Sequence, residues 1–271
     1  MRTLSIALLA LFLSAPASAD QSHFRVEKGK TTWHFDVAWT DAGGERHNIN
    51  YALSARTVKE DLKEPLKFKP AKASRYVAEQ VNSWASKQRG VSISATPNSD
   101  GGVDLSGTAK DGEKLRAAMD EATRVRDEAT ARYLEDNGYT TLDGKIIPDH
   151  SRHVTEYADN LSPLVTALGG PTGDPRAFAE LALSFVQSIP YEKRALVSDR
   201  YRRPLSVLGR NIGDCDSKTV LFLALMRQAY PDLPLAMVYV RGHAYGALGM
   251  EAEKGEYDFR HDGQQWVGVE P

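Results

Sequence analysis

The sequence predicts an α+β protein, in which helices pack on antiparallel sheets whose strands follow one another along the chain. Three observations carry this prediction. Segments in which apolar and polar residues alternate occur in pairs around turn residues, at 23–54 and 91–105. A long segment of helical periodicity follows each pair. Near the carboxyl end, an apolar helix at 215–226 precedes a series of short apolar strands.

The composition is that of an ordinary globular chain of 271 residues, with 41% hydrophobic and 26% charged residues. This length allows one large domain or two smaller ones, each with its own core. The formal charge of -2 and the pI near 6.4 give no reason to expect a nucleic acid or an anionic lipid as a partner. We expect no cofactor, and no acidic loop has the spacing of a calcium site.

Residues 1–19 have the layout of a secretory signal peptide. A short basic lead, Met1–Thr3, precedes an apolar run from Leu4 to Leu13, and Ala17-Ser18-Ala19 is a small-residue cleavage site. The run is shorter than the roughly 20 apolar residues of a membrane helix. We therefore expect an exported protein, periplasmic or secreted, that begins near Asp20 and keeps no integral membrane segment after cleavage.

Residues 20–138 are predicted to form a small N-terminal domain with the order β-β-α-β-β-α. Its elements are a hairpin at 23–54, a charged connection at 59–70, a helix at 71–88, a hairpin at 91–105 and a helix at 111–137. The aromatic stripe of the first hairpin is interpreted as core rather than as a sugar-binding platform. Asn137-Gly138 ends the longest helix. No chemistry is identified in this domain.

Residues 139–173 are predicted to be a linker followed by a helix. Residues 139–148 are rich in Thr, Gly and Asp and end in a proline, and the helix is expected at 153–168. His150 and His153 would share a helix face, so a metal site is conceivable. Because no third ligand of the usual pattern is nearby, solvated histidines at a helix start are the favoured interpretation.

Residues 174–271 are predicted to form the second domain. The expected elements are a helix at 174–189, a basic loop at 194–210, the helix at 215–226, and strands at 235–240, 243–250, 257–259 and 265–271. The first helix has a capping residue, Asp174, and a first-turn proline, Pro175. The basic loop is interpreted as solvated rather than as a site for an acidic substrate.

The only cysteine, Cys215, lies in the first turn of a predicted helix, directly after the capping sequence Gly213-Asp214. There the unpaired backbone N–H groups and the helix dipole favour the thiolate, which is a nucleophile. A core role is the alternative, because free cysteine is among the most buried residue types. In an exported protein a lone cysteine suggests a reactive thiol or intermolecular pairing, so we favour the nucleophile.

A helix followed by an antiparallel meander can bring the start of the helix and the ends of two strands to one edge. Cys215, His243 and a carboxylate would then converge there. These are the nucleophile, the base and the orienting acid of acyl-transfer chemistry. Glu270 and Asp258 are the two candidate carboxylates, and we favour Glu270.

Four separated motifs in the last third of the chain, from about Asp174 to Pro271, resemble the transglutaminase-like superfamily, which includes exported bacterial members with a papain-like core. The motifs are Phe185-Val186-Gln187-Ser188-Ile189-Pro190-Tyr191, Gly213-Asp214-Cys215-Asp216-Ser217-Lys218, His243-Ala244 and Trp266-Val267-Gly268-Val269-Glu270-Pro271. By this resemblance, Cys215 matches the nucleophile, His243 the base, and Glu270 the usual aspartate.

The resemblance implies a papain/transglutaminase-like core and an exported cysteine-dependent peptidase, amidase or transamidase that forms a thioester on Cys215. The partner would be a peptide or protein substrate, and a cell-wall peptide is compatible. The oxyanion would be held by the backbone N–H of Cys215 and by Gln187 or Tyr191. A catalytically inactive binding or assembly module is the alternative, because Glu270 replaces the usual aspartate.

Overall fold

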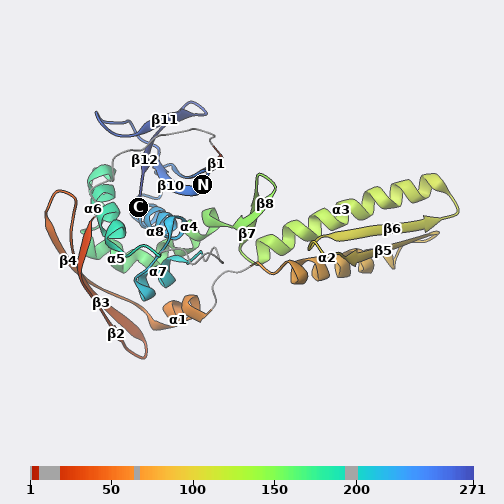
Figure 1. Ribbon diagram of the computed structural model, residues 1–271, viewed down its shortest axis with the longest axis horizontal. Coiled ribbons are helices and arrows are strands. Elements are labelled where there is room, and N and C mark those ends of the chain that lie inside the picture. Colours follow the sequence, from red (N-terminus) through yellow and green to blue (C-terminus); the bar gives the residue numbers. More distant parts are fainter. Residues whose placement is uncertain (1, 6–18, 64–67, 193–200) are drawn as a thin grey trace. The chain divides into compact units, whose positions relative to one another are not determined.

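The computed structural model describes residues 2–5, 19–63, 68–192 and 201–271, and it has the predicted α+β architecture, with helices and several small antiparallel sheets (Figure 1). The chain divides into two compact units. The first combines Met1–Leu66 with His150–Pro271, and the second is Lys67–Asp149. Each unit is described by itself.

The second unit is a pair of helices against a hairpin. Its elements are α2 (Pro70–Ala85), β5 (Val91–Pro97), β6 (Val103–Ala109), α3 (Gly112–Asp136), β7 (Tyr139–Leu142) and β8 (Lys145–Pro148). Asp111 begins α3 by accepting hydrogen bonds from the N–H groups of Glu113 and Lys114. Val81 and Ala122 are fully buried in a small core. The predicted helices and hairpin of this segment are confirmed.

The predicted linker at 139–148 is wrong, because β7 and β8 pair as an antiparallel hairpin. The turn residues, Asp143 and Gly144, have positive φ angles of 49° and 74°. Two successive residues of positive φ match the twist of paired strands, and Asp-Gly is a common sequence for such a turn. The Asp-Gly dipeptide was therefore the available signal.

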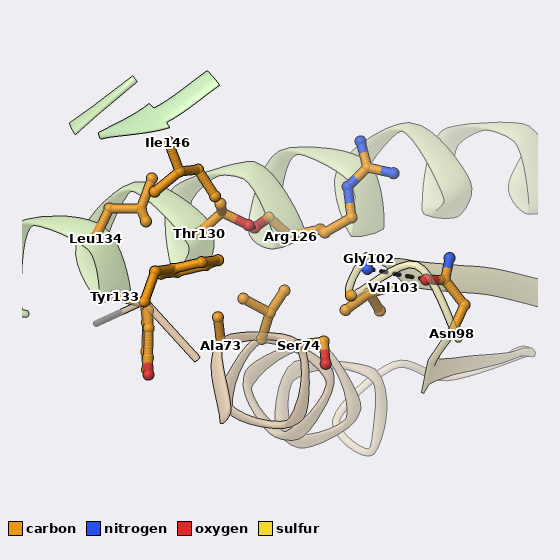
Figure 2. Close-up of a pocket in the computed structure, with 13 residues that line it drawn as sticks. Ala73, Ser74, Asn98, Gly102, Val103, Arg126, Thr130, Tyr133, Leu134 and Ile146 are labelled. Carbon is orange, nitrogen blue, oxygen red and sulfur yellow. Dashed lines mark hydrogen bonds between the residues drawn. The ribbon is translucent and has the colours of Figure 1, made fainter. Parts of the chain in front are cut away.

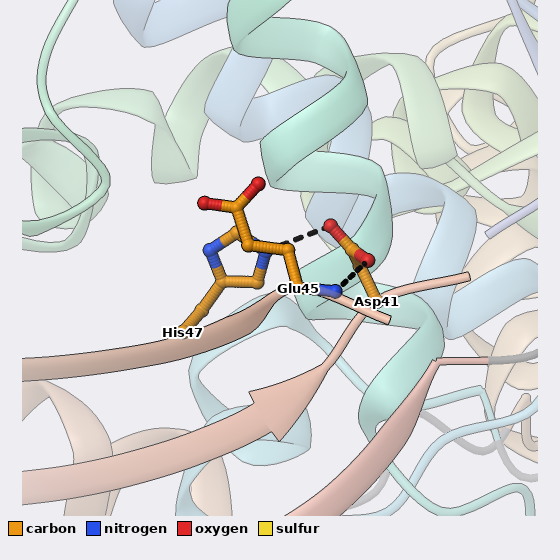
Figure 3. A group of neighbouring side chains, drawn as sticks. All are labelled: Asp41, Glu45 and His47. Atoms are coloured by element: carbon orange, nitrogen blue, oxygen red, sulfur yellow. Dashed lines mark hydrogen bonds and ion pairs between the residues drawn. The ribbon is translucent and has the colours of Figure 1, made fainter. Parts of the chain in front are cut away.

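The first unit contains a three-stranded antiparallel sheet of β2 (Asp20–Lys28), β3 (Thr32–Thr40) and β4 (Arg46–Ser54). A turn that begins at Asp41 joins β3 to β4, within the predicted hairpin at 23–54. Figure 3 shows how side chains close this turn: His47 Nε2 lies 2.8 Å from Asp41 Oδ2, and Glu45 N–H donates to Asp41 Oδ1. These hydrogen bonds, that of His47 first, lower the pKa of Asp41.

The aromatic stripe of β3 is core, as predicted. Trp33, Phe35 and Trp39 are at most 4% exposed and belong to the same hydrophobic cluster as the helices of the carboxyl-terminal part. The predicted domain boundary therefore differs from the compact units, because residues 20–63 pack with 150–271. The apolar face of β3 must be covered, and the sheet contacts α5 (Ser162–Ala167) and α6 (Pro175–Ser188), which come much later in the sequence.

The helices of the first unit are α1 (Ala55–Lys63), α4 (His150–Ala158), α5 (Ser162–Ala167), α6 (Pro175–Ser188), α7 (Pro204–Arg210) and α8 (Cys215–Ala229). The predicted helix at 153–168 is divided by a 3₁₀ turn at Asp159–Leu161. Part of the predicted connection at 59–70 is helical in α1. Asp174 caps α6 and Pro175 begins it, as predicted.

The predicted basic loop at 194–210 is only partly a loop, since α7 occupies its second half and residues 194–200 lie outside the described part of the chain. Arg202 makes two hydrogen bonds to the carboxylate of Glu192, and Arg203 lies 3.3 Å from Asp61. Their side chains are 12% and 23% exposed. The solvated interpretation is wrong for these two arginines, which tie segments of the fold together.

The last sheet has the order β1-β9-β10-β12-β11, and α8 packs on it. Its strands are β1 (Arg2–Ser5), β9 (Leu235–Val240), β10 (His243–Leu248), β11 (Asp258–His261) and β12 (Gln264–Val269). β1 is parallel to β9, and the other pairs are antiparallel. Most of the predicted leader, residues 6–18, lies outside the described residues. Among the helices described, none has the length and apolar character required to span a bilayer.

Candidate active site

The start of α8 is fixed from both sides. Asp214 caps the helix by accepting a hydrogen bond of 3.0 Å from the N–H of Ser217. Gly213 bonds through its backbone to Pro190 and Glu192, the segment that follows α6. A Cβ at Gly213 would lie 3.0 Å from Lys218 Cγ, so a larger residue would push against α8. Cys215 is therefore held as the first residue of the helix, buried at 5% exposure.

His243 is brought to this helix start by a tight turn in the sheet. It begins β10 opposite Val240, the last residue of β9, and Gly242 between them has a φ of 79°. The backbone of the neighbouring residue, Ala244, accepts a hydrogen bond from Thr219 of α8 at 3.4 Å. The first two turns of α8 and the first residues of β10 therefore lie together.

Glu270 follows β12, which runs antiparallel to β10 with Val269 opposite Gly246. This register carries the end of β12 toward the beginning of β10. Nε2 of His243 lies 2.7 Å from Oε1 and 2.9 Å from Oε2 of Glu270. The two side chains are 37% and 50% exposed. Cys215, His243 and Glu270, which are far apart in sequence, thus line the same cavity.

The electrostatics of the group favour a protonated imidazole. A hydrogen bond with the Cys215 side chain, followed by the hydrogen bond with Glu270, raises the pKa of His243 to about 10 against the opposing effect of burial. Both neighbours stabilise positive charge on the ring. The Cys215 sulfur also lies 3.3 Å from Oδ1 of Asp216, the next residue in α8.

Asp258, the rival carboxylate, lies elsewhere in the sheet. It begins β11, which is separated from β10 by β12, and its Oδ2 accepts a hydrogen bond of 2.9 Å from Gln265. Of the two carboxylates, Glu270 is the one that contacts His243.

Gln187 and Lys218 connect the three parts of the site. Gln187 Nε2, near the end of α6, donates to the backbone oxygen of Glu270 at 2.7 Å. Lys218 Nζ, in α8, donates to the backbone oxygen of Gln187 at 3.3 Å. The predicted oxyanion role of Gln187 therefore competes with a hydrogen bond that its amide already makes, and Glu270 is anchored beyond the end of its strand.

Lys218 was not predicted as a site residue. It is 5% exposed, and burial lowers its pKa to about 8 while the charge of Glu270 opposes the shift. The signal in the sequence was its spacing: Lys218 is three residues from Cys215 on a helix and therefore on the same face. A lysine on such an apolar helix is expected to have a specific partner.

These residues line one cavity of about 510 Å³. Its walls are Ala19, Asp20, Gln21, Gln187, Ser188, Ile189, Pro190, Tyr191, Cys215, Lys218, His243, Glu270 and Pro271. Tyr191, the other predicted oxyanion donor, belongs to this wall and is 51% exposed. The cavity is large enough for a side chain and its flanking peptide groups, and Cys215 lines it from the first residue of α8.

The two histidines of α4 are not solvated, which corrects that prediction. His150 and His153 are each 3% exposed, and their rings lie 4.6 and 5.4 Å from the ring of Tyr201. Burial lowers the pKa of His150 to about 3 and that of His153 to about 4. His150 Nδ1 is hydrogen-bonded to the Tyr239 hydroxyl. The pair is an uncharged part of the interior.

Other candidate sites have less chemistry. In the described residues, three potential metal ligands approach one another at Asp41, Glu45 and His47, and the hydrogen bonds of the turn account for this arrangement. A cavity of about 410 Å³ lies in the second unit between α2, α3 and the β5–β6 turn (Figure 2). Figure 2 shows Tyr133, Leu134, Val103 and Ile146 around it, a mainly apolar lining.

Comparison with known proteins assigns no relative: no protein-family profile, curated protein or solved structure shows a significant match to this chain.

Proposed function

We propose that the protein is an exported cysteine-dependent acyl-transfer enzyme that acts on a peptide or protein amide through a thioester on Cys215. The observation that carries the proposal is that His243 bonds to Glu270 and lines the same cavity as Cys215, the first of the groups that raise the pKa of the histidine. We further propose that α8 with β9–β12 is a papain/transglutaminase-like core, on the four motifs of the sequence.

The chemistry follows from the charges. The Cys215 thiolate attacks the carbonyl carbon of the amide, and the resulting oxyanion is stabilised by the backbone N–H of Cys215. The imidazolium of His243 gives its proton to the leaving amine as the C–N bond breaks, which leaves a thioester. Water or a second amine then attacks the thioester, His243 takes the proton of that nucleophile, and the thiolate is released.

Glu270 supports both steps by holding the ring and stabilising its positive charge, as the third member of a triad does. The requirement for an anchored carboxylate is met by the hydrogen bond from Gln187 and by the pairing of β12 with β10 and β11. Glutamate is one methylene longer than aspartate, and its carboxylate still lies 2.7 Å from Nε2 of His243. These features favour an active site over the inactive binding module.

Alkylation by iodoacetamide provides the first test, because it requires no substrate. At pH 6 an ordinary thiol is almost entirely protonated, whereas a thiolate paired with imidazolium reacts. We expect rapid modification of Cys215 at pH 6 and a loss of about tenfold or more in His243→Ala. His261→Ala is the matched control, because His261 is similarly exposed at 40% and lies near Asp262.

A second test addresses the reaction itself. Exposure of the protein to a library of acyl-donor peptides should give a covalent acyl adduct on Cys215, detected by intact mass and absent in Cys215→Ser. Slow alkylation at pH 6 that His243→Ala leaves unchanged, together with no adduct, would favour the inactive module.

A further inference from the structure

Lys218 brings to the Cys215 cavity a positive charge that no carboxylate contacts among the described residues. The lysine is 5% exposed and lines the same cavity as Cys215 and Glu270. Within the described part of the chain its Nζ makes one hydrogen bond, of 3.3 Å to the backbone oxygen of Gln187, and no ion pair. An ammonium has three N–H donors, and a buried one is expected to have an anionic partner.

The course of the lysine side chain directs it toward the nucleophile. Long side chains in helices lean toward the helix N-terminus. Lys218 does so, because its Cγ would lie 3.0 Å from a Cβ at Gly213, two residues before α8 begins. Glycine at this position therefore leaves the space that the lysine stem occupies. The ammonium is directed toward the end of α8 that carries Cys215, and it bonds to Gln187 near the end of α6.

The other charged groups of the cavity wall are paired with one another or exposed. Glu270 is bonded to His243, and in the proposed mechanism the Cys215 thiolate is paired with the same imidazolium. Asp20 is exposed. Burial lowers the pKa of Lys218 to about 8, so the amine is still protonated at pH 6. Lys218 is therefore the cation of this wall that is available to a bound anion.

We propose that Lys218 is the anion-binding group of this cavity, and that the substrate carries a carboxylate beside the amide that Cys215 attacks. This inference rests on the proposed acyl-transfer function and adds the class of substrate. The carboxylate is the free C-terminus of a peptide or an acidic side chain next to the cleaved bond, since both present the same group to an ammonium. Lys218 holds it through charge-assisted hydrogen bonds, and no covalent bond to the lysine forms.

Two alkylating agents of similar shape test the charge preference without a known substrate. Iodoacetate carries a carboxylate where iodoacetamide carries a neutral amide, and with both agents the sulfur displaces iodide from a methylene carbon. No oxyanion develops in this displacement, so the comparison measures recognition of the carboxylate and not stabilisation of a tetrahedral intermediate. The rate of Cys215 modification by each agent is measured at pH 6 by intact mass, and the ratio of the two rates is formed within each protein.

We expect the ratio of the iodoacetate rate to the iodoacetamide rate to fall about tenfold or more in Lys218→Met, because a charge-assisted hydrogen bond is lost. Lys254→Met removes the same charge from an exposed turn and should leave the ratio unchanged. A purely structural role of Lys218 would slow both agents equally and would also leave the ratio unchanged in Lys218→Met.

Matched acyl-donor peptides distinguish the two sources of the carboxylate. The members of one pair end in a free carboxylate or in a C-terminal amide, and the members of the other pair differ only in a glutamate or a glutamine beside the scissile bond. In the pair that identifies the source, the acidic member should acylate Cys215 faster in the wild-type protein and should lose this advantage in Lys218→Met.

The negative results have different meanings. A rate ratio that is equal in the wild-type protein and in Lys218→Met, with fast iodoacetamide alkylation that His243→Ala slows, would overturn the carboxylate inference and leave the proposed enzyme intact. Acylation that favours neither acidic peptide would also overturn the inference. Slow iodoacetamide alkylation at pH 6 that His243→Ala leaves unchanged would overturn the proposed function, and the inference with it.

Discussion

Nε2 of His243 faces both carboxylate oxygens of Glu270, at 2.7 and 2.9 Å. Because this nitrogen is occupied, we infer that Nδ1 is the atom that serves Cys215. The arrangement fixes the ring in one orientation, and it places a negative charge beside the imidazole. The following expectations depend on this relationship and on the buried groups around it.

Glu270→Gln should lower turnover by about 10²–10⁴-fold, the usual contribution of a general acid or base, because the neutral amide no longer stabilises the imidazolium. The pH 6 alkylation rate should fall with it. Asp258→Asn is the matched control, since Asp258 lies on β11, the strand beyond β12, and bonds to Gln265 there. A larger loss of turnover for Asp258→Asn than for Glu270→Gln would show that Asp258 orients His243 and that the assignment to Glu270 is wrong.

The ring of His243 should stay protonated to an unusually high pH. Its pKa is raised from 6.5 to about 10, so the stability that it contributes is complete below about pH 6.5 and is lost as pH rises toward 10. Histidine NMR titration of the folded protein checks this. Alkylation of Cys215 removes the largest cause of the shift, and the measured pKa should then fall. An unchanged value after alkylation would show that the sulfur is not the partner.

Acid should destabilise the protein through the two histidines of α4. Their folded-state pKa values, about 3 and about 4, lie below the unfolded value near 6.5, so the unfolded chain binds protons first as the pH falls. Stability is complete above about pH 6.5 and should decrease by about 2 kcal/mol per histidine at pH 5. Urea unfolding at pH 7 and pH 5 measures this loss.

His153→Phe is the informative variant for the acid effect. Phenylalanine keeps a ring against Tyr201, and Nδ1 of His153 has no hydrogen-bond partner to lose among the residues that the structure describes. The variant should retain stability at pH 7 and recover about half of the acid loss. Equal acid loss in both proteins would place the sensitive groups outside this cluster.

Lys218→Met should raise the stability of the protein and lower the reactivity of Cys215. The lysine pKa is lowered from 10.5 to about 8, so the folded state is penalised as pH falls through this range, and the penalty is complete below about pH 8. Removal of the buried charge should raise the free energy of unfolding at pH 7 by about 1–3 kcal/mol. Cys215 alkylation should slow, because the backbone oxygen of Gln187 loses the hydrogen bond from Lys218, and Gln187 in turn anchors Glu270 beside His243. Lys254→Met, in an exposed turn, should change neither quantity.

Local patterns in the sequence were sufficient for several elements. The alternation of Trp33, Phe35 and Trp39 predicted a buried strand face, and Asp174-Pro175 and Gly213-Asp214 predicted two helix starts that the structure confirms. These features depend on backbone sterics and on hydrogen bonds between neighbours in the chain. The turn at Asp143-Gly144 carried an equally local signal that the linker interpretation overlooked.

Burial of polar side chains required the fold. His150 and His153 occur in a polar sequence, and the packing of distant residues such as Tyr201 and Tyr239 against them removes water. The pairing of Arg202 with Glu192 and of Arg203 with Asp61 likewise depends on which segments meet. A charged residue has the same local pattern whether it is solvated or paired.

The sequence by itself determined the α+β class, the helix that begins at Cys215, and three residue types suited to acyl transfer, because each of these is written in short-range periodicity and capping. Only the tertiary structure decided that β2–β4 pack with the carboxyl-terminal part, that Glu270 rather than Asp258 contacts His243, and that Ala19–Gln21 line the same cavity. Those outcomes follow from the register of the sheet and from the packing of distant segments on apolar faces. Neither can be predicted from a short stretch of the chain.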